Sequence, residues 1–560
     1  MDSQPELLND PVQQGVAQIG DTLYASFDEA LNDSEAGDTI TLLQDVTTAG
    51  INLNHDVIID GNNHTLSFTQ YGIALWSSNL TINNTIVSMN GITSTPYTAE
   101  WNWMSICASK DASMTLNNSS LYMNGQNNNV HAIYFCSNNK LNLNNSYLEI
   151  INYQQDALEW DGGDGGYNVN MVNSTYLSDN NRSGFTGTFY ASINHSTVNV
   201  VNSRGNGSNG SNFDIRNNSF VNFTVNAAHG LSASNLSIVN SHVVARENGA
   251  NGIHVSNNLL IDGGSQVEIT GNRCSLSSKW TIPGALYING PSTIQNCTLN
   301  ITDNLGSGIY QKSGTLTIAD SASVNIIRNT ATMLGLGGGI NINGTASISS
   351  NVQLYNNHAS VAGDDIYSTG KVSFGTTGTN WMLDGDPDCS HKITGWFEDG
   401  IKGNDGTSYR WKAHKTEGEN YYVVNMPSGE YEGQLALKAA HGLHTITIHY
   451  LEKDTNKVVH DDFVLNDVES GPYDVTKQGK LAIKGYAYVD MDYAFVGSLD
   501  QDIEINVYYT KDKPKTTKKE TKKDVPTAFG FDVNLWTSLM GVSSLGIITS
   551  VKLSRKNKRK

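Results

Sequence analysis

The feature that most constrains the fold is an internal repeat whose basal period is 22 to 24 residues. In each repeat an apolar landmark residue is followed, two positions later, by Asn or another residue that favours a tight bend. Insertions lengthen some steps to between 27 and 34 residues, so the array is neither a heptad coiled coil nor a 34-residue helical repeat. The landmarks are Ile59, Ile82, Leu116, Leu143, Met171, Ile193, Ile215, Ile238, Ile261, Ile294, Ile318 and Ile348.

The positions around each landmark predict three short strands per repeat. Apolar residues return in alternation about five and seven positions after the landmark, and a third strand precedes it by about eight. Asn and Gly tolerate the positive φ of a tight bend, and stacked Asn side chains can hydrogen-bond along a column. We therefore predict an all-β, right-handed parallel β-helix, a single-stranded solenoid, because an antiparallel sandwich would not keep a constant period. The bend column reads Asn84, Asn118, Asn145, Asn173, His195, Asn217, Asn240, Gly263, Asn296 and Asp320.

Composition and charge exclude some classes of function. Charged residues make up 16% of the chain and the net charge is −19, although the C-terminal end is basic. An acidic body without a basic stripe argues against nucleic-acid binding. The five cysteines are odd in number and show no CxxC spacing, so we expect neither a disulfide scaffold nor a zinc site. Residues 1–18 hold no apolar signal-peptide core and are expected to be disordered, so an export signal would lie upstream or have been removed.

The start of the repeat region carries a family resemblance. Ser26 and Glu29 form a capping box, which predicts a short helix that covers the first coil. The stretch from Ile19 to Phe68, with GDTITL at 37–42 and VIIDG at 57–61, resembles the opening of pectate-lyase-like β-helix domains in surface proteins of Gram-positive bacteria. The segments GGGI at 337–340 and GDDIY at 363–367 are similar to repeats of polymorphic outer-membrane autotransporters. We expect the capped β-helix to span residues 19–383.

Three further segments follow the repeat region. Residues 384–440 are rich in aromatic residues and glycine, and we expect them to form a small β cap or spacer. Residues 441–510 open and close with alternating strands and resemble mucin-binding-protein (MucBP-type) repeats, which implies a β-sandwich or β-grasp-like module that acts as a stalk or binds host glycans. Residues 511–528 form a Lys/Thr/Pro linker, which we expect to be extended.

The C-terminus predicts attachment to a membrane or a cell wall. Residues 529–553 contain an apolar run that predicts a transmembrane anchor, and residues 554–560 form a basic tail expected on the cytoplasmic side. Linker, apolar run and basic tail resemble the sorting signal of Gram-positive wall-anchored proteins. Val525, Pro526 and Thr527 lie where that signal has its motif but lack the Thr-Gly pair of LPxTG. Sortase is therefore one expected partner and a plain membrane anchor the alternative; both place the body at the cell surface.

One acidic cluster is the candidate for catalysis. A lyase needs acidic ligands for Ca²⁺ and a basic side chain, and a hydrolase needs two carboxylates across the scissile bond. Glycine pairs at 162–163 and 165–166 favour a flexible, solvated turn over a preorganised site. We therefore expect no catalytic residue, no metal site and no cofactor here, with Ca²⁺ as the one ion that the cluster could hold. The weak catalytic candidates are Asp156, Glu159, Asp161, Asp164 and Arg182.

A binding surface is the better-supported expectation. The outward position of the strand before each landmark carries a series of rings, which fall on one face of a stacked solenoid and suit sugar rings. Long insertions on a solenoid are frequent binding sites. The candidate binding residues on the strands are Tyr134, His254, Tyr287, Tyr310 and Tyr367, and those in or near long insertions are Trp101, Trp103, Trp160 and Trp280.

Three functions fit these observations. The leading hypothesis is a cell-surface adhesin-like protein whose β-helix binds a glycan or a host polymer without catalysis. The second is a surface polysaccharide lyase or glycoside hydrolase of the pectate-lyase-like class, and the third is a structural stalk. A compact cluster of carboxylates with Arg or Lys on the β-helix face would favour the enzyme, whereas an aromatic groove without such a cluster would favour binding.

Overall fold

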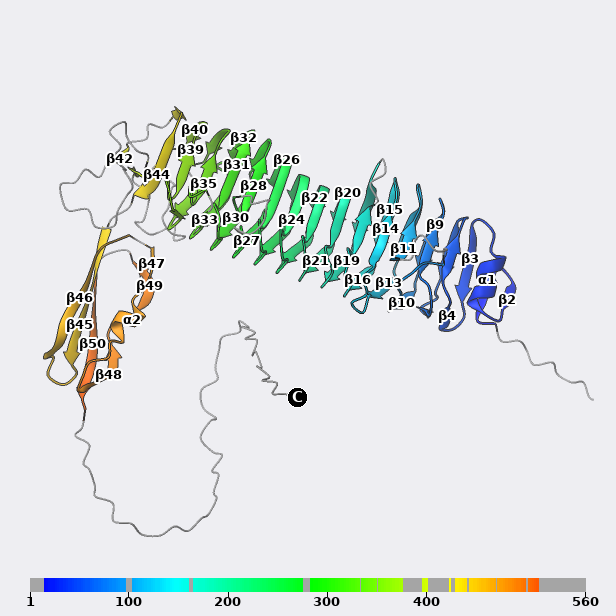
Figure 1. Ribbon diagram of the computed structural model, residues 1–560, viewed down its shortest axis with the longest axis horizontal. Coiled ribbons are helices and arrows are strands. Elements are labelled where there is room, and N and C mark those ends of the chain that lie inside the picture. Colours follow the sequence, from blue (N-terminus) through cyan, green and yellow to red (C-terminus); the bar gives the residue numbers. More distant parts are fainter. Residues whose placement is uncertain are drawn as a thin grey trace, which may run out of the picture. The chain divides into compact units, whose positions relative to one another are not determined.

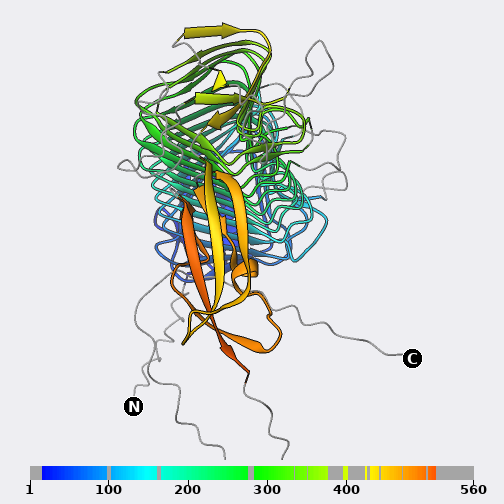
Figure 2. The same cartoon turned by 90° about the vertical axis from the view of Figure 1, so that its left-hand side faces the viewer.

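The computed structural model describes residues 15–96, 103–160, 165–274, 283–332, 334–349, 351–375, 395–400, 423–424, 429–440, 443–469, 471–499 and 502–512. Most of these residues form a β-solenoid in which each coil contributes strands to three parallel sheets (Figure 1). Figure 2 shows the same stack turned by 90°, with successive coils behind one another. The parallel solenoid predicted from the repeat is therefore confirmed.

The first sheet carries the strands that precede the landmark residues. Its strands are β5 (Ile51–Leu53), β8 (Ile73–Leu75), β11 (Met104–Ala108), β14 (His131–Phe135), β17 (Leu158–Trp160), β20 (Phe185–Asn194), β22 (Ser208–Arg216), β24 (Leu231–Val239), β26 (Ile253–Asp262), β28 (Leu286–Asn289), β31 (Ile309–Ser313), β35 (Ile340–Ile342) and β39 (Ile366–Ser368).

The second sheet carries the landmarks themselves. It continues directly from the first sheet through the long strands β20, β22, β24 and β26. Its other strands are β3 (Asp38–Leu42), β6 (Val57–Asp60), β9 (Asn79–Asn83), β12 (Ser113–Asn117), β15 (Asn139–Asn144), β18 (Tyr167–Val172), β29 (Ser292–Ile294), β32 (Thr315–Ile318), β36 (Thr345–Ile348) and β40 (Lys371–Phe374).

The third sheet follows the bend column. Its strands are β4 (Val46–Thr48), β7 (Thr65–Phe68), β10 (Ile86–Asn90), β13 (Ser120–Asn124), β16 (Tyr147–Ile151), β19 (Thr175–Asp179), β21 (Thr197–Val201), β23 (Phe220–Thr224), β25 (His242–Arg246), β27 (Ser265–Thr270), β30 (Cys297–Thr302), β33 (Ser323–Ile327) and β37 (Val352–Tyr355). A short parallel pair, β34 (Thr330–Ala331) and β38 (His358–Ala359), lies beyond its last strands.

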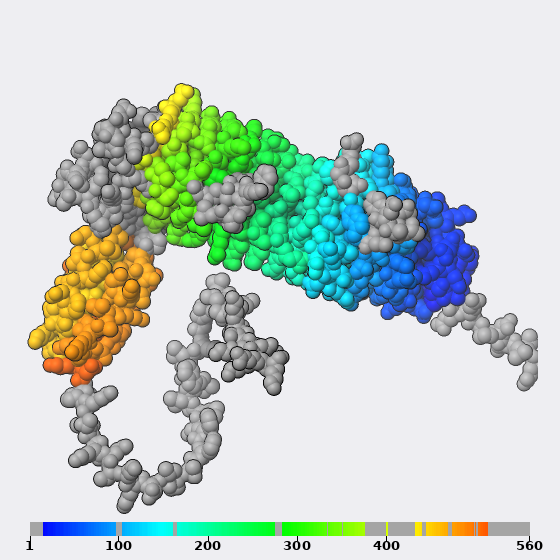
Figure 3. All heavy atoms as spheres, in the orientation of Figure 1, coloured from blue at the N-terminus to red at the C-terminus, as the bar shows by residue number. Residues whose placement is uncertain are grey.

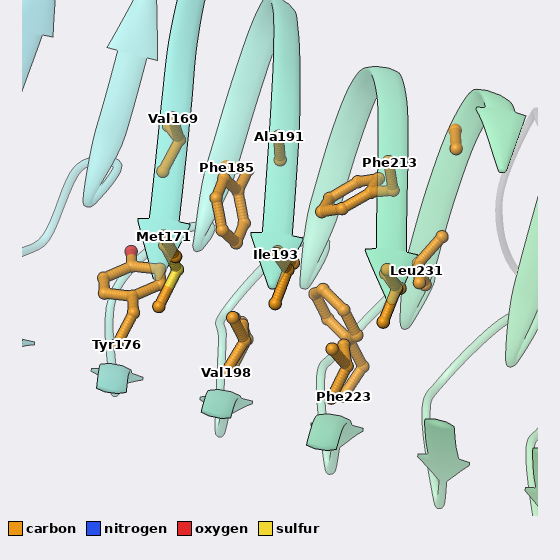
Figure 4. Close-up of a cluster of buried hydrophobic side chains, with 14 of the residues drawn as sticks. Val169, Met171, Tyr176, Phe185, Ala191, Ile193, Val198, Phe213, Phe223 and Leu231 are labelled. Atoms are coloured by element: carbon orange, nitrogen blue, oxygen red, sulfur yellow. The ribbon is translucent and has the colours of Figure 1, made fainter. Parts of the chain in front are cut away.

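Inward-pointing side chains fill the solenoid because residues alternate between its two faces along each strand. In the middle coils Met171, Ile193 and Val198 pack between the sheets with a group of phenylalanines (Figure 4). Phe213 meets Phe185 and Phe189 edge to face, at ring-centroid distances of 5.4 and 5.2 Å. The coils follow one another in sequence order (Figure 3), so each coil packs mainly on the next.

The bend column between the second and third sheets adopts the predicted backbone. Asn84, Asn118, Asn145 and Asn173 have φ values of 49°, 49°, 49° and 50°. Their side chains also bond from coil to coil: Nδ2 of Asn118 donates to Oδ1 of Asn84 at 3.3 Å, and Nδ2 of Asn173 to Oδ1 of Asn145 at 3.1 Å. Both expectations for this column are therefore confirmed.

A second Asn column, not anticipated from the sequence, runs through the buried bend after the third sheet. Each Asn accepts a hydrogen bond at Oδ1 from the preceding one and donates through Nδ2 to the next, at 2.8 to 3.0 Å. These amides satisfy backbone groups that the bend takes out of water, which explains why polar side chains are buried here. The column consists of Asn226, Asn248, Asn272, Asn304, Asn329 and Asn357.

The two ends of the solenoid are covered differently. At the start, β1 (Ala17–Ile19) pairs antiparallel with β2 (Thr22–Tyr24) and β3, and helix α1 (Phe27–Asp33) buries Phe27, Ala30 and Leu31 in the core. Oγ of Ser26 accepts a hydrogen bond from the Glu29 backbone N–H at 3.2 Å, as the capping box predicts. The cysteines Cys107, Cys274 and Cys297 are buried.

At the far end, strands of the 384–440 segment pair antiparallel with the last coil. Strand β44 (Leu435–Ala440) runs along β39, and β43 (Gly429–Glu432) along β40. Strand β41 (Gly395–Glu398) pairs antiparallel with β44, and β42 (Val423–Val424) pairs antiparallel with β41. Lys438 Nζ lies 3.2 Å from Asp364 Oδ2, and both side chains are buried. This segment therefore ends the parallel sheets by changing the strand direction.

Residues 443–511 form a separate mixed sheet. Its order is β46 (Val458–Glu469), β45 (Leu443–Glu452), β50 (Ile503–Lys511) and β48 (Tyr486–Met491), with β45 and β50 parallel. Helix α2 (Thr476–Gly479) and the pair β47 (Gly471–Asp474) and β49 (Val496–Leu499) complete it. Within the described residues, no helix combines the length and apolarity that a membrane span needs. Residues 1–18 were predicted to be disordered; residues 1–14 lie outside the described residues, whereas Ala17 and Gln18 belong to strand β1, so the prediction is wrong for them. The linker beyond residue 512, the sorting-like motif, the anchor at 529–553 and the basic tail also lie outside the described residues.

Candidate functional site

Four polar side chains from three consecutive coils converge at one end of the first sheet. His131 opens β14, Asp156 directly precedes β17, Glu159 lies within β17, and Arg182 precedes β20. The parallel register, with Ile133 opposite Leu158, sets these coils side by side. Nδ1 of His131 lies 3.6 Å from Oδ2 of Asp156 and 3.9 Å from Oε2 of Glu159. We call these four residues the acid cluster.

Asp156 and Arg182 form the fixed part of the acid cluster. The Asp156 side chain is fully buried, and the Arg182 guanidinium donates to it through Nε at 3.0 Å and through Nη2. Nη1 of Arg182 donates to Oε1 of Gln155 at 2.9 Å, and the Arg182 backbone N–H donates to the Gln155 carbonyl at 3.0 Å. A bidentate pair of this kind holds a carboxylate in one orientation inside the protein.

Glu159 is the group whose protonation the site changes most. Its side chain is 16% exposed, and its Oε2 lies 3.8 Å from Arg182 Nη2 without a hydrogen bond to any described residue. Burial, followed by hydrogen bonding with Asp156 and the charge of that residue, raises the pKa of Glu159 to about 9. Glu159 is therefore protonated at neutral pH and can donate a proton.

His131 lies beside the two carboxyl groups but stays neutral. Burial lowers the pKa of His131 to about 4, although the Asp156 charge acts in the opposite direction. Its backbone N–H donates to the Trp103 carbonyl at 2.9 Å, and its ring meets the Trp103 ring edge to face at a centroid distance of 5.4 Å. Nδ1 of His131 makes no hydrogen bond with the residues that the structure describes.

Aromatic side chains frame the acid cluster. Trp103 is 37% exposed and meets Tyr134 edge to face, with ring centroids 4.5 Å apart. Trp160 lies against Gly187 of the next coil, where φ is +93° and an added Cβ would come within 2.7 Å of the Trp160 Cβ. Glycine is needed at this position both for its backbone conformation and for the ring. The cluster thus has one exposed ring, Trp103, and one ring that packs on the next coil, Trp160.

The structure brings together only part of the residues named from the sequence. Asp156, Glu159 and Arg182 meet, whereas Asp161, Asp164, Trp101 and Trp280 lie outside the described residues. The expectation of a solvated turn is wrong for Asp156, which is fully buried, and for Glu159, which lies in a strand. The glycine pairs begin only after that strand ends.

His131 was not among the site residues predicted from the sequence. One signal was available, because His131 precedes Asp156 by 25 residues, which is close to one basal repeat. Residues one repeat apart occupy equivalent places in adjacent coils of a solenoid, so such a pair is a candidate contact.

The column of rings does not present ring faces to a ligand. His254, Tyr287 and Tyr310 lie opposite one another in β26, β28 and β31, as expected from the repeat. However, the His254 and Tyr287 rings stack on each other at a centroid distance of 4.6 Å and an angle of 12°, and those of Tyr287 and Tyr310 at 5.7 Å and 14°. Because each ring covers its neighbour's face, a sugar cannot stack on these faces without separating them.

The other strand rings in the prediction are largely buried. Tyr134, Tyr287 and Tyr367 are 8%, 6% and 7% exposed. Tyr367 packs with Ala362 and with Ala436 of the terminal strand β44. These rings therefore contribute more to the packing of neighbouring coils than to an open surface.

Three residues of the acid cluster also form a group of side chains that could hold a metal ion. One ligand atom from each of His131, Asp156 and Glu159 lies within 4.8 Å of the others. Ca²⁺ takes six to eight oxygen ligands. Among the described residues, only two carboxyl groups lie here, and the Arg182 guanidinium already binds one of them. These described residues alone do not supply the oxygen ligands of Ca²⁺, and they fit proton transfer better.

Comparison with known proteins adds little. No protein-family profile and no curated protein sequence matches the chain. The fold has a match to a solved structure, the crystal structure of the periplasmic alginate epimerase AlgG, over 60% of this chain and 84% of that chain, with 11% sequence identity and a TM-score of 0.22. A likeness of this degree says nothing about activity or substrate, so the function is argued from the site.

Proposed function

We propose that this protein is an enzyme that cleaves glycosidic bonds in a polysaccharide, with Glu159 as the general acid. The observation that supports this is the part-buried Glu159 carboxyl beside the fixed Asp156–Arg182 pair, surroundings that raise its pKa to about 9. In hydrolysis, Glu159 gives its proton to the leaving-group oxygen as the C–O bond breaks. Water then adds to the glycosyl carbon and returns a proton to the Glu159 carboxylate, so a carboxyl group that is protonated at neutral pH can start and complete the reaction. Asp156, being fully buried, positions Glu159 and does not contact the substrate.

The shape of the site favours a long substrate. The acid cluster and Trp103 come from four consecutive coils, β11 to β20, so a ligand that touches all of them extends along the solenoid. The exposed Trp103 ring offers an apolar surface of the kind that packs against sugar rings. A linear glycan satisfies both conditions, which is why the enzyme alternative is preferred here to non-catalytic binding through the stacked rings.

The extracellular setting is part of the proposal and rests on the sequence. The features that support it are the resemblances to surface β-helix and MucBP-type modules, the linker at 511–528, and the apolar run with its basic tail. In this arrangement the solenoid lies outside a Gram-positive cell, and it is held there by a membrane anchor or by attachment to the cell wall through sortase. An adhesin or stalk role uses the same display, and the activity test below separates it from the enzyme.

The test is an activity screen of the full chain against neutral and acidic polysaccharides, with measurement of new reducing ends and of unsaturated products. Glu159→Gln keeps the shape of the side chain but removes its proton-donating carboxyl, and it is expected to lower kcat by about 100-fold or more. Activity of the unaltered chain is expected to persist to about pH 9 and to fall above it, as Glu159 ionises.

Glu149→Gln is the matched control, because Glu149 is a partly buried outward residue of β16 on the third sheet. It is expected to leave activity unchanged. No product from any polysaccharide, or equal activity in Glu159→Gln, would return the adhesin hypothesis to first place.

A further inference from the structure

A groove lined by polar and apolar side chains lies on the second sheet, away from the acid cluster. It crosses the coils of β20, β22, β24 and β26. Its lining includes Tyr190, Asn212, Asp214, Arg216, Asn235 and Asn258. None of these residues takes part in the acid cluster, and the proposed activity does not use them.

The floor of the groove is a ladder of amides. Nδ2 of Asn235 donates to Oδ1 of Asn212 at 2.6 Å, and Nδ2 of Asn258 donates to Oδ1 of Asn235 at 2.7 Å. An amide has two N–H donors and two acceptor lone pairs, so Asn235 keeps one of each after these two bonds. Neighbouring strands lie about 4.8 Å apart, so the ladder presents a row of amide donors and acceptors along the solenoid, to which the hydroxyl groups of an oligosaccharide can hydrogen-bond.

One wall of the groove is a ring held in place. Tyr190 is 41% exposed, and its hydroxyl donates to Oδ2 of Asp214 at 3.1 Å. The register of β20 shifts between Gly187 and Tyr190, and that of β24 shifts between Ala233 and Asn235. Such irregularities re-aim the side chains that follow them. A ring fixed in this way loses little freedom when a sugar packs against it.

The charges of the groove cancel each other. Arg216 donates through Nε to Oδ1 of Asp214 at 3.0 Å and through Nη2 to the other oxygen. The remaining polar side chains of the lining named above are amides and a hydroxyl. A charged sugar would find no unpaired opposite charge among these side chains, whereas an uncharged sugar does not need one in order to bind.

From these contacts we infer that the groove between Tyr190 and Asn258 is a second, non-catalytic binding site for an uncharged oligosaccharide. It holds a polymer on the solenoid independently of whether the acid cluster cleaves it. Sugar packing on Tyr190 and hydrogen bonds to the amide ladder supply the recognition.

The test is calorimetric titration of the full chain carrying Glu159→Gln, so that no ligand is consumed. The probes are cellohexaose, xylohexaose and mannohexaose as uncharged oligomers and hexagalacturonate as a charged one. At least one uncharged hexaose is expected to bind, and Tyr190→Ala is expected to weaken that binding by about tenfold. Asn235→Leu, which removes the free donor and acceptor, is expected to weaken it as well.

Tyr122→Ala is the matched control, since Tyr122 is 40% exposed on the third sheet, and it is expected to bind as before. Thermal unfolding of each variant shows whether it is folded. Absence of binding by every uncharged hexaose, binding of hexagalacturonate alone, or unchanged affinity in a folded Tyr190→Ala variant would overturn the inference. The catalytic proposal is judged separately, by the products of the unaltered chain.

Discussion

At the scale of single residues, burial controls the protonation of the acid cluster. The same loss of solvent that raises the pKa of Glu159 to about 9 lowers that of His131 to about 4. Both side chains are thus neutral at pH 7, and the fixed charges are those of Asp156 and Arg182. When Glu159 gives its proton to a substrate it becomes an anion, and the Arg182 guanidinium, with Nη2 3.8 Å from Glu159 Oε2, is the cation that stabilises it.

The raised pKa of Glu159 makes stability depend on pH. The folded protein holds the Glu159 proton more tightly than the unfolded chain, whose pKa is close to the ordinary 4.5. This stabilisation is fully present below about pH 4.5 and is lost as the pH rises toward 9. Glu159→Gln removes the titration, so we expect the variant to gain stability relative to the unaltered protein between pH 5 and pH 9. Urea unfolding of both proteins at pH 5 and at pH 9 measures the difference in their free energies of unfolding. A difference that is the same at both pH values would contradict the prediction.

The Asp156–Arg182 pair gives a second prediction. Arg182→Ala leaves the fully buried Asp156 carboxylate without its cation. We expect a loss of about 2 kcal/mol, less than the roughly 3–5 kcal/mol of a fully buried pair, because Arg182 is 47% exposed. Arg246→Ala is the control, since Arg246 has the same exposure but pairs with a more exposed Glu268. Chemical unfolding should show less than about 1 kcal/mol for it; equal losses would argue against the buried-charge account.

At the scale of elements, the buried Asn column ties neighbouring bends together. Oδ1 of Asn272 accepts from the Asn248 backbone N–H at 3.1 Å and from Asn248 Nδ2 at 2.8 Å. Nδ2 of Asn272 donates to the Ala245 carbonyl at 2.9 Å and to Asn304 at 3.0 Å. One side chain thus satisfies polar groups of the two neighbouring coils, all of them out of reach of water.

Asn272→Ala tests this role. Removing the amide leaves several buried donors and acceptors unsatisfied, and we expect a loss of about 3 kcal/mol in the free energy of unfolding. Asn142→Ala is the control, because Asn142 also belongs to an amide ladder but is only half-buried on the second sheet. Water can replace its partners, so its loss should stay near 0.5–1 kcal/mol. Similar losses for both variants would show that burial of the column does not matter.

At the scale of the whole molecule, a solenoid is stabilised by contacts between neighbours, so its ends are its weakest parts. The last coil is held by the antiparallel strand β44, which carries Lys438 beside Asp364. Asp364 also accepts from the Ala359 backbone N–H at 2.8 Å. The pair therefore joins the terminal strand to the bend of the last coil.

Lys438→Met keeps most of the side-chain volume but removes its charge beside buried Asp364. We expect amide hydrogen exchange to become faster in β39 and β40 while β16 and β19 keep their protection, because the effect stays near the end of the array. Lys140→Met changes an exposed lysine in the middle of the solenoid and should alter exchange in neither region. A uniform loss of protection along the solenoid would contradict the nearest-neighbour account.

The solenoid, its bends and its first cap can be predicted from the amino-acid sequence alone. The 22-to-24-residue period, the alternation of apolar residues and the positive φ of Asn84 and its equivalents are set by local conformational preferences, which a single chain segment already expresses. The chemical environment of the surface side chains depends on how the coils pack in the tertiary structure. Which coils meet depends on insertions and strand register, and these bring His131 to Asp156, bury Glu159 so that it keeps its proton, and turn the faces of the Tyr287 and Tyr310 rings toward each other. Burial and contact between distant residues are properties of the packed coils, and no local pattern encodes them.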